Sequence, residues 1–115
     1  SWGLPPTQFA LEMMEYLNSQ PDTKVVILTK TPTVKGRAWV SECKINFKNR
    51  WFPNNDMFLV AGDKSLFKSD IIIDDLKGNC EKHKKINNSS ALLYRIGITS
   101  IEDIKQVLED VRSKN

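Results

Sequence analysis

Two adjacent acids, Asp74 and Asp75, directly follow the run Ile71-Ile72-Ile73. Three isoleucines in a row are typical of a buried strand, whereas two carboxylates cannot be buried with it. The acids must therefore emerge at the carboxyl end of the strand, where open α/β folds bind their ligands. Because two neighbouring carboxylates repel one another, a bound cation or a bound proton has to reduce this repulsion. The pattern predicts a divalent-metal site.

Two further polar residues follow apolar segments. Thr29 comes directly after Val-Val-Ile-Leu, and Lys64 comes just past Phe-Leu-Val-Ala-Gly. Taken singly, Thr29 is explained as a cap, Lys64 as a solvated turn residue, and the acid pair as a loop with a helix cap. In a parallel sheet, however, the carboxyl ends of the strands share one edge. The sequence therefore predicts that a hydroxyl, an ammonium and two carboxylates meet in one pocket.

These residue types suit one task, the binding of a phosphate group together with Mg²⁺. Mg²⁺ prefers carboxylate oxygens and keeps water and substrate phosphate oxygens as its other ligands. A lysine is a point charge for phosphate, and a threonine hydroxyl donates one further hydrogen bond to it. Because phosphoryl transfer depends mainly on positioning and on neutralisation of charge, the four residues predict a phosphoryl-transfer site.

What the sequence lacks is a nucleophile. It contains no glycine-rich phosphate loop, no serine elbow and no Cys/His pair. His83, the only histidine, lies in the charged segment Glu81-Lys82-His83-Lys84-Lys85. We therefore expect His83 at the surface and not as a catalytic base.

The elements that must position these residues alternate along the chain. Helical spacing or capping signals predict helices over residues 9–19, 38–47 and 77–85 and from Ser100 onwards, where Asp103 completes a capping box. Apolar and β-branched runs predict strands over residues 24–29, 57–61, 70–73 and 91–94, and a loop is expected around 31–36. Strands that alternate with helices predict an α/β sandwich with a mostly parallel sheet.

Size and charge narrow the class of protein. The 115 residues suit one domain over 1–115, and 40% apolar with 27% charged residues is ordinary for a globular protein. The net charge is only +3, and the one basic cluster, over 77–85, is expected to be a solvated helix face and not a phosphate-binding patch. A nucleic-acid polymer is therefore not an expected partner.

Two features of the sequence bear on location. No apolar stretch approaches the roughly 20 residues that span a membrane, so no membrane association is expected. Cys43 and Cys80 match no metal-ligand spacing, and we expect both to be reduced, half-buried thiols. Reduced thiols are typical of a cytoplasmic protein.

The order of these signals resembles the haloacid dehalogenase-like superfamily, and within it the phosphatase core of the 5′(3′)-deoxyribonucleotidases. The resemblance runs from Leu4-Pro5-Pro6 to the final helix. Thr29, in Val-Val-Ile-Leu-Thr-Lys-Thr-Pro, matches the family's second motif, and Pro32 falls where the nucleotidases commonly have a proline. Lys64 matches the family's lysine, and Asp74-Asp75 match its acidic pair.

This resemblance implies a role for each residue. Thr29 would bind the transferring phosphoryl group, and Lys64 would neutralise that group and the nucleophile. Lys30 falls where the nucleotidases often contact substrate phosphate. Asp74 and Asp75 would hold Mg²⁺, directly or through water. The implied fold is a Rossmann-like three-layer α/β sandwich, and the implied substrate is a nucleotide or another phosphomonoester.

The sequence departs from the family at its first motif. In the family an Asp-x-Asp sequence supplies the nucleophile and the general acid, and this chain contains no such sequence. The cap segment that follows that motif is missing too. The family's first strand lies between the strands that here carry Thr29 and Asp74. The expected sandwich is therefore incomplete at its amino-terminal strand, and two strands are expected to have an unpaired edge each.

Three explanations of this departure stay open. The first strand comes from an upstream fragment of a longer enzyme, or two copies of the chain form a homodimer by strand exchange, or the sheet has closed over the loss. The implied function is Mg²⁺-dependent hydrolysis of (deoxy)nucleoside monophosphates, with the nucleophilic aspartate outside this chain. The alternative is a catalytically inactive binding or interaction domain. Whether the chain is itself an enzyme stays open with these explanations.

Overall fold

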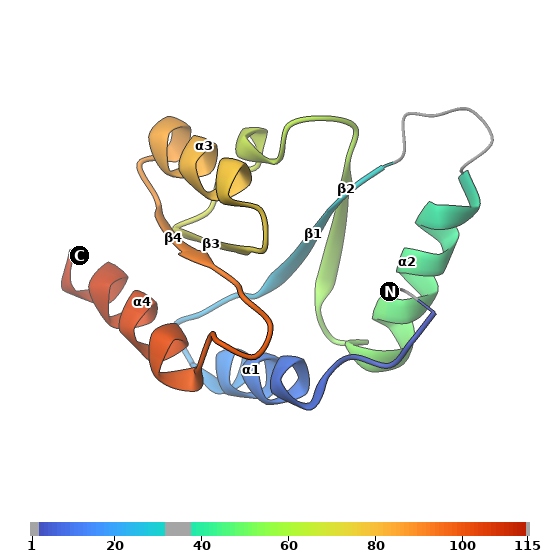
Figure 1. Ribbon diagram of the computed structural model, residues 1–115, viewed down its shortest axis with the longest axis horizontal. Coiled ribbons are helices and arrows are strands. Elements are labelled where there is room, and N and C mark those ends of the chain that lie inside the picture. The colour runs from blue at the N-terminus through green and yellow to red at the C-terminus, as the bar shows by residue number, and fades with distance from the viewer. Residues whose placement is uncertain (1–2, 32–37, 115) are drawn as a thin grey trace. The chain divides into compact units, whose positions relative to one another are not determined.

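The computed structural model describes residues 3–31 and 38–114 and divides the chain into two compact units, Ser1–Asp63 and Lys64–Asn115. Each unit contains a two-stranded parallel sheet and helices (Figure 1). The described part of the chain is therefore α/β with parallel strand pairing, as the sequence predicts. The loop predicted around 31–36 falls mainly outside the described residues.

The first unit begins with helix α1, Gln8–Ser19. Thr7 is its N-cap, since its extended backbone precedes the helix and its side chain accepts a hydrogen bond from Ala10 N (3.1 Å). This bond satisfies one of the N–H groups that the first turn of a helix leaves without a partner. The apolar stripe of α1 consists of the buried Met14 and Leu17 and the half-buried Phe9, Met13 and Tyr16.

The sheet of the first unit is a β–α–β crossover. Strand β1, Val26–Lys30, pairs in parallel with β2, Asp56–Val60, and helix α2, Ala38–Trp51, lies between them in the sequence (Figure 1). Thr29 is opposite Leu59 in this register. Parallel strands need a crossover of this kind because a short hairpin cannot join them. The carboxyl ends of β1 and β2 therefore lie at the same edge, and Thr29 lies next to the last residue of β1.

A paired amide contact holds the amino end of this sheet. Asn55, just before β2, is buried, and its Nδ2 donates to Asn18 Oδ1 (2.8 Å) and to Val25 O (3.1 Å). Asn18 Nδ2 donates back to Asn55 Oδ1 (3.1 Å). Because a buried amide must find partners for its donors and acceptor, these contacts fix α1 and the start of β1 to the start of β2.

The second unit contains another β–α–β crossover. Strand β3, Ile71–Asp74, pairs in parallel with β4, Ser90–Leu93, and helix α3, Lys77–Asn87, connects them. A 3-10 turn, Lys64–Leu66, precedes β3. Asn88 follows the last residue of α3, and its φ of 51° is the left-handed conformation that often terminates a helix.

Helix α4, Ile101–Ser113, completes the second unit, and α3 and α4 both contact the sheet that Figure 1 draws between them. The predicted capping box is confirmed, because Ser100 Oγ accepts from Asp103 N (3.3 Å) and Asp103 Oδ2 accepts from Ser100 N (2.9 Å). The buried apolar side chains of this unit are those of Ile72, Cys80, Ile104, Val107 and Leu108. The face of α4 that carries Ile104, Val107 and Leu108 is therefore its core face.

Element types follow the prediction closely, whereas burial follows it less well. All eight predicted helices and strands are present in the described residues, with bounds that differ from the predicted ones by at most four residues. Two large aromatic side chains are well exposed, since Trp39 of α2 is 63% exposed and Phe58 of β2 is 41% exposed. The basic side chains of α3 are solvent-exposed, as expected for a solvated helix face. No helix among the described residues is long and apolar enough to cross a membrane.

Candidate functional site

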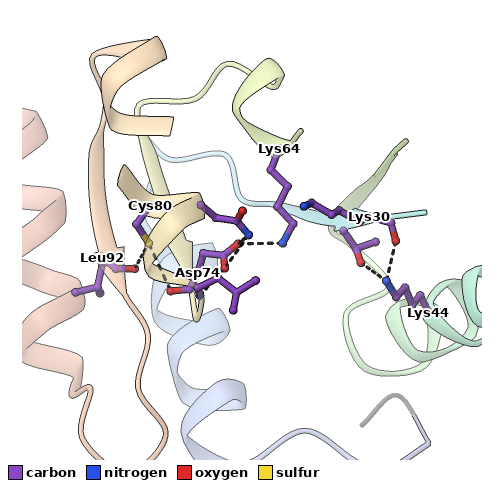
Figure 2. A network of polar contacts seen from close by, with 9 residues as sticks. Lys30, Lys44, Lys64, Asp74, Cys80 and Leu92 are labelled. Carbon is purple, nitrogen blue, oxygen red and sulfur yellow. Dashed lines mark hydrogen bonds and ion pairs between the residues drawn. The ribbon is translucent and has the colours of Figure 1, made fainter. Parts of the chain in front are cut away.

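Lys64 and Asp74, two of the predicted site residues, form an ion pair in the second unit. Lys64 Nζ lies 2.9 Å from Asp74 Oδ2 (Figure 2). The Lys64 side chain is 18% exposed and that of Asp74 only 5% exposed. Lys64 comes from the 3-10 turn before β3, and Asp74 is the last residue of β3. The predicted meeting of this ammonium with this carboxylate is therefore present.

Three kinds of donor surround the Asp74 carboxylate. Besides Lys64 Nζ, Leu76 N donates to Oδ1 (2.8 Å), and Asn79 Nδ2 lies 3.3 Å from each oxygen. Burial alone acts to raise the pKa of Asp74, but the bond from Leu76 N and the bond and charge of Lys64 outweigh it and lower the pKa. Asp74 is therefore an anion in the folded protein at neutral pH.

Asp75, the second predicted metal ligand, is solvent-exposed next to Asp74. Within residues 3–31 and 38–114, no group of three or more His, Cys, Asp or Glu side chains is placed to hold a metal ion. The two acids therefore offer at most a pair of carboxylates, and Lys64 already occupies one oxygen of Asp74. Mg²⁺ is commonly held by one or two carboxylates, with water and substrate oxygens as its other ligands. In donor type the pair fits Mg²⁺, with Asp75 as the accessible carboxylate.

Cys80 on α3 lies beside the backbone of this site. Its Sγ is 3.6 Å from Asp74 O and 3.7 Å from Leu92 O. Burial, followed by the negative charge of Asp74, raises the pKa of the Cys80 thiol. Cys80 is therefore a protonated thiol at neutral pH and not a nucleophile. Cys43 and Cys80 are both free, as the sequence predicts.

Thr29 and Lys30, the other predicted phosphate-binding residues, belong to the first unit. Thr29 is 5% exposed, and its Oγ1 accepts a hydrogen bond from Lys44 Nζ (2.8 Å). Lys44 Nζ also donates to Lys30 O (2.8 Å), as Figure 2 shows. The Lys30 side chain is exposed at the end of β1. The structure thus places a second ammonium, that of Lys44, on the predicted threonine.

Sequence reasoning missed Lys44, although its position carries a signal. Val40, Cys43 and Phe47 recur along α2 at the spacing of one helix face, and Lys44 falls on the same face. A lysine on the inner stripe of a helix needs a buried or partly buried partner. Thr29 Oγ1 and Lys30 O are those partners.

His83 is the clearest correction to the sequence analysis, because it was expected at the surface and is 0% exposed. Its Nε2 lies 2.9 Å from Phe67 O and its Nδ1 lies 2.7 Å from Ser89 Oγ. A carbonyl oxygen can only accept, so Nε2 carries the hydrogen, and Nδ1 of the neutral ring accepts from the Ser89 hydroxyl. The surrounding charges belong to neighbouring residues that point to solvent. The sequence did contain a signal for this burial. His83 follows Cys80 by three residues, and this spacing puts both side chains on the inner face of α3.

Comparisons with protein-family models, with curated proteins and with solved structures found no match to this chain.

Proposed function

We propose that this chain is part of a Mg²⁺-dependent phosphomonoester hydrolase of the 5′-nucleotidase type, with a core like that of the haloacid dehalogenase-like superfamily. Its substrates are (deoxy)nucleoside monophosphates, and its nucleophilic aspartate lies outside this chain. The observation that carries the proposal is the 2.9 Å contact between Lys64 Nζ and Asp74 Oδ2 at the carboxyl end of β3, with Asp75 exposed beside it.

The chemistry of this pair supports a phosphate site more than a purely structural one. A buried ion pair contributes little net stability, since the desolvation of both charges offsets their attraction. Here the pair lies where a strand ends, next to a second carboxylate that is exposed to solvent. A lysine ammonium and an accessible carboxylate in one place can neutralise a phosphate group and hold a metal ion, respectively.

In this proposal each residue has one task. Asp75 and Asp74 hold Mg²⁺, which screens the negative charge of the bound phosphate group. Lys64 orients the Asp74 carboxylate and supplies a positive charge to the phosphoryl oxygens. In the first unit, Thr29 and Lys30 have the role that the resemblance gives them, as contacts to substrate phosphate. Free cysteines agree with a cytoplasmic location for the enzyme.

Strand pairing also supports an additional strand. Among the described residues β1 pairs with β2 and β3 pairs with β4, so β1 and β3 each have a single strand partner. In the sandwich that the sequence resembles, the strand with the nucleophilic aspartate pairs with both. A strand from an upstream segment or from a second copy of the chain would satisfy the remaining backbone groups of β1 and β3.

The test is an assay of deoxynucleoside monophosphate hydrolysis with Mg²⁺, run beside light scattering to obtain the mass of the species in solution. The chain by itself is expected to be inactive, since it contains no Asp-x-Asp sequence. A protein extended upstream of Ser1 to include an Asp-x-Asp segment is expected to be active and to lose activity with Lys64→Met. Hydrolysis by the 115-residue chain alone would instead show that one of its own acids is the nucleophile.

A second candidate is a catalytically inactive domain that keeps the phosphate pocket for binding. The absence of Asp-x-Asp from the sequence favours it. The reading frame upstream of Ser1 separates the two candidates, because a start codon close to Ser1 leaves no source for the nucleophile in the same polypeptide. Phosphate binding without hydrolysis by a well-folded monomer would then support the binding domain.

A further inference from the structure

Trp39, in the first turn of α2, is the most exposed aromatic side chain among the described residues of the first unit, at 63% exposed. Within residues 3–31 and 38–114 its indole makes no hydrogen bond and no contact with another ring. Trp51, at the other end of the same helix, is half-buried and has the Arg50 guanidinium 5.1 Å from the centre of its ring. The two tryptophans of α2 thus differ, because only the ring of Trp39 has both faces available for a ligand.

The direction of α2 puts Trp39 at the carboxyl edge of the sheet formed by β1 and β2. Helix α2 ends at Trp51, five residues before the start of β2, so this end of the helix lies at the amino edge of the sheet. A crossover helix between parallel strands runs back along the sheet, so its first turn lies at the opposite edge. Figure 1 shows α2 returning in this way from the end of β1. Trp39 therefore shares an edge with Thr29 and Lys30, the last two residues of β1.

The contacts of Lys44 fix how α2 lies against the end of β1. Its Nζ donates to Thr29 Oγ1 and to Lys30 O, both at 2.8 Å. Trp39 precedes Lys44 by five residues, which corresponds to about 7.5 Å along the helix axis. Because the helix runs away from the carboxyl edge, this distance leads from Lys44 toward that edge and past the end of β1. The exposed indole therefore lies on the solvent side of the residues that the resemblance assigns to substrate phosphate.

We propose that Trp39 recognises the base of a nucleoside monophosphate, with its indole stacked on the base while the phosphate is bound at the end of β1. This inference rests on the proposed function, and it names the residue that selects nucleotides among phosphomonoesters. Every base has a flat π-face, and aromatic side chains bind bases by stacking on that face. One sugar separates the base of a nucleotide from its phosphate. This arrangement suits an indole about one and a half helical turns from Lys44, the residue that contacts Thr29 and Lys30.

The surroundings of Trp39 favour a single base over a protein partner. The next large apolar side chain exposed on α2 is that of Ile45, which lies about 120° away around the helix. The exposed position between them in the sequence is Glu42, so this part of α2 has no continuous apolar patch. A stable protein interface buries roughly 800 Å² on each partner, far more than one ring provides. Because stacking tolerates any base, Trp39 predicts a preference for nucleotides over sugar phosphates and not for one particular base.

The test is isothermal titration calorimetry of the full chain, with Mg²⁺ present, against deoxyadenosine monophosphate and 2-deoxyribose 5-phosphate, of which only the first carries a base. The wild type is expected to bind the nucleotide about tenfold more tightly, a gain typical of one stacked base. Trp39→Ala is expected to lose this preference with its sugar phosphate affinity unchanged, whereas Trp39→Phe retains most of the preference. Ile45→Ala, on another face of α2, is the matched control and is expected to bind both ligands like the wild type. Circular dichroism reports whether each variant is folded.

NMR provides a direct readout of stacking. The indole N–H resonance that is missing from Trp39→Phe identifies Trp39, and it is expected to shift with the nucleotide but not with the sugar phosphate. If the folded Trp39→Ala variant bound both ligands with the affinities of the wild type, the role of Trp39 would be overturned and the proposed function would stand. Equal affinity of the wild type for the two ligands would have the same meaning. Failure of the folded wild type to bind either ligand would overturn both proposals.

Discussion

Lys64 Nζ and Asp74 Oδ2 lie 2.9 Å apart with both side chains largely removed from solvent. This contact joins the 3-10 turn before β3 to the last residue of β3, so it contributes to the fold as well as to the proposed site. Removal of one partner leaves the other as a buried or partly buried charge without compensation. The two roles must therefore be separated by experiment.

Lys64→Met is expected to lower the free energy of unfolding by about 3 kcal/mol, because it leaves the Asp74 carboxylate buried without its ammonium. The ion pair with Asp74 makes this stability cost the expected result. Urea unfolding followed by circular dichroism measures the change.

The control for this variant is Lys68→Met, which removes the same charge from an exposed position four residues away. It is expected to change stability by no more than about 0.5 kcal/mol. If Lys64→Met proved as stable as Lys68→Met, the ion pair would contribute nothing to folding. A loss of phosphate binding in such a folded variant would then be a direct effect on the site.

Acid is expected to weaken the fold through Asp74. The pKa of Asp74 is lowered in the folded protein, so the folded state binds fewer protons there than the unfolded state does. The resulting stabilisation is complete at pH values above about 4, the pKa of an aspartate in the unfolded chain. It is lost as the pH falls through the lower pKa that Asp74 has in the folded protein. The free energy of unfolding should therefore decline below about pH 4.

Asp74→Asn isolates this contribution, because other carboxylates also titrate in acid. The stability difference between the wild type and Asp74→Asn is expected to be largest near neutral pH and to shrink as the pH falls. Urea unfolding over a pH series measures it. A difference that stays constant down to about pH 2 would mean that Asp74 has the same pKa in both states.

The sequence predicted the elements well because their signals are local. Thr7 and Ser100 cap their helices through contacts within four residues. Runs of β-branched residues form strands where one face of the strand packs against other parts of the chain. Burial of single polar side chains was harder to predict because it depends on contacts far along the chain. His83 reaches Phe67, sixteen residues away, and Lys44 reaches Thr29, fifteen residues away.

Part of the candidate site was also predictable, because the residues concerned lie close together in the sequence. Lys64 and Asp74 are ten residues apart, one in the turn before β3 and the other at the end of β3, and the structure brings them into contact. The identity of the other donors to Asp74 was not predictable, since Asn79 contacts it only because α3 begins within three residues of the end of β3. The predicted convergence of all the site residues and the Mg²⁺ site stay predictions.

His83→Leu is expected to lower the free energy of unfolding by about 2 kcal/mol or more, because it takes both ring nitrogens away from a buried hydroxyl and a carbonyl. His83 joins α3 to the segments before β3 and before β4 through Phe67 O and Ser89 Oγ. Lys84→Leu, at the exposed neighbouring position, is the control and is expected to be nearly neutral. Equal stability of the two variants in urea would mean that the His83 contacts are not formed in solution.

Asp75→Asn is expected to weaken Mg²⁺ affinity by at least about tenfold, the loss found when a group that holds or orients a metal is removed. Asp75 is exposed and directly follows β3, so its replacement should leave the free energy of unfolding within about 0.5 kcal/mol of the wild type. Asp70→Asn, an exposed acid just before the same strand, is the matched control and should bind Mg²⁺ like the wild type. Isothermal titration calorimetry with MgCl₂ measures all three proteins. An affinity that is the same for Asp75→Asn and Asp70→Asn would remove Asp75 from the metal site, whereas a loss confined to Asp75→Asn would place the cation at the carboxyl end of β3.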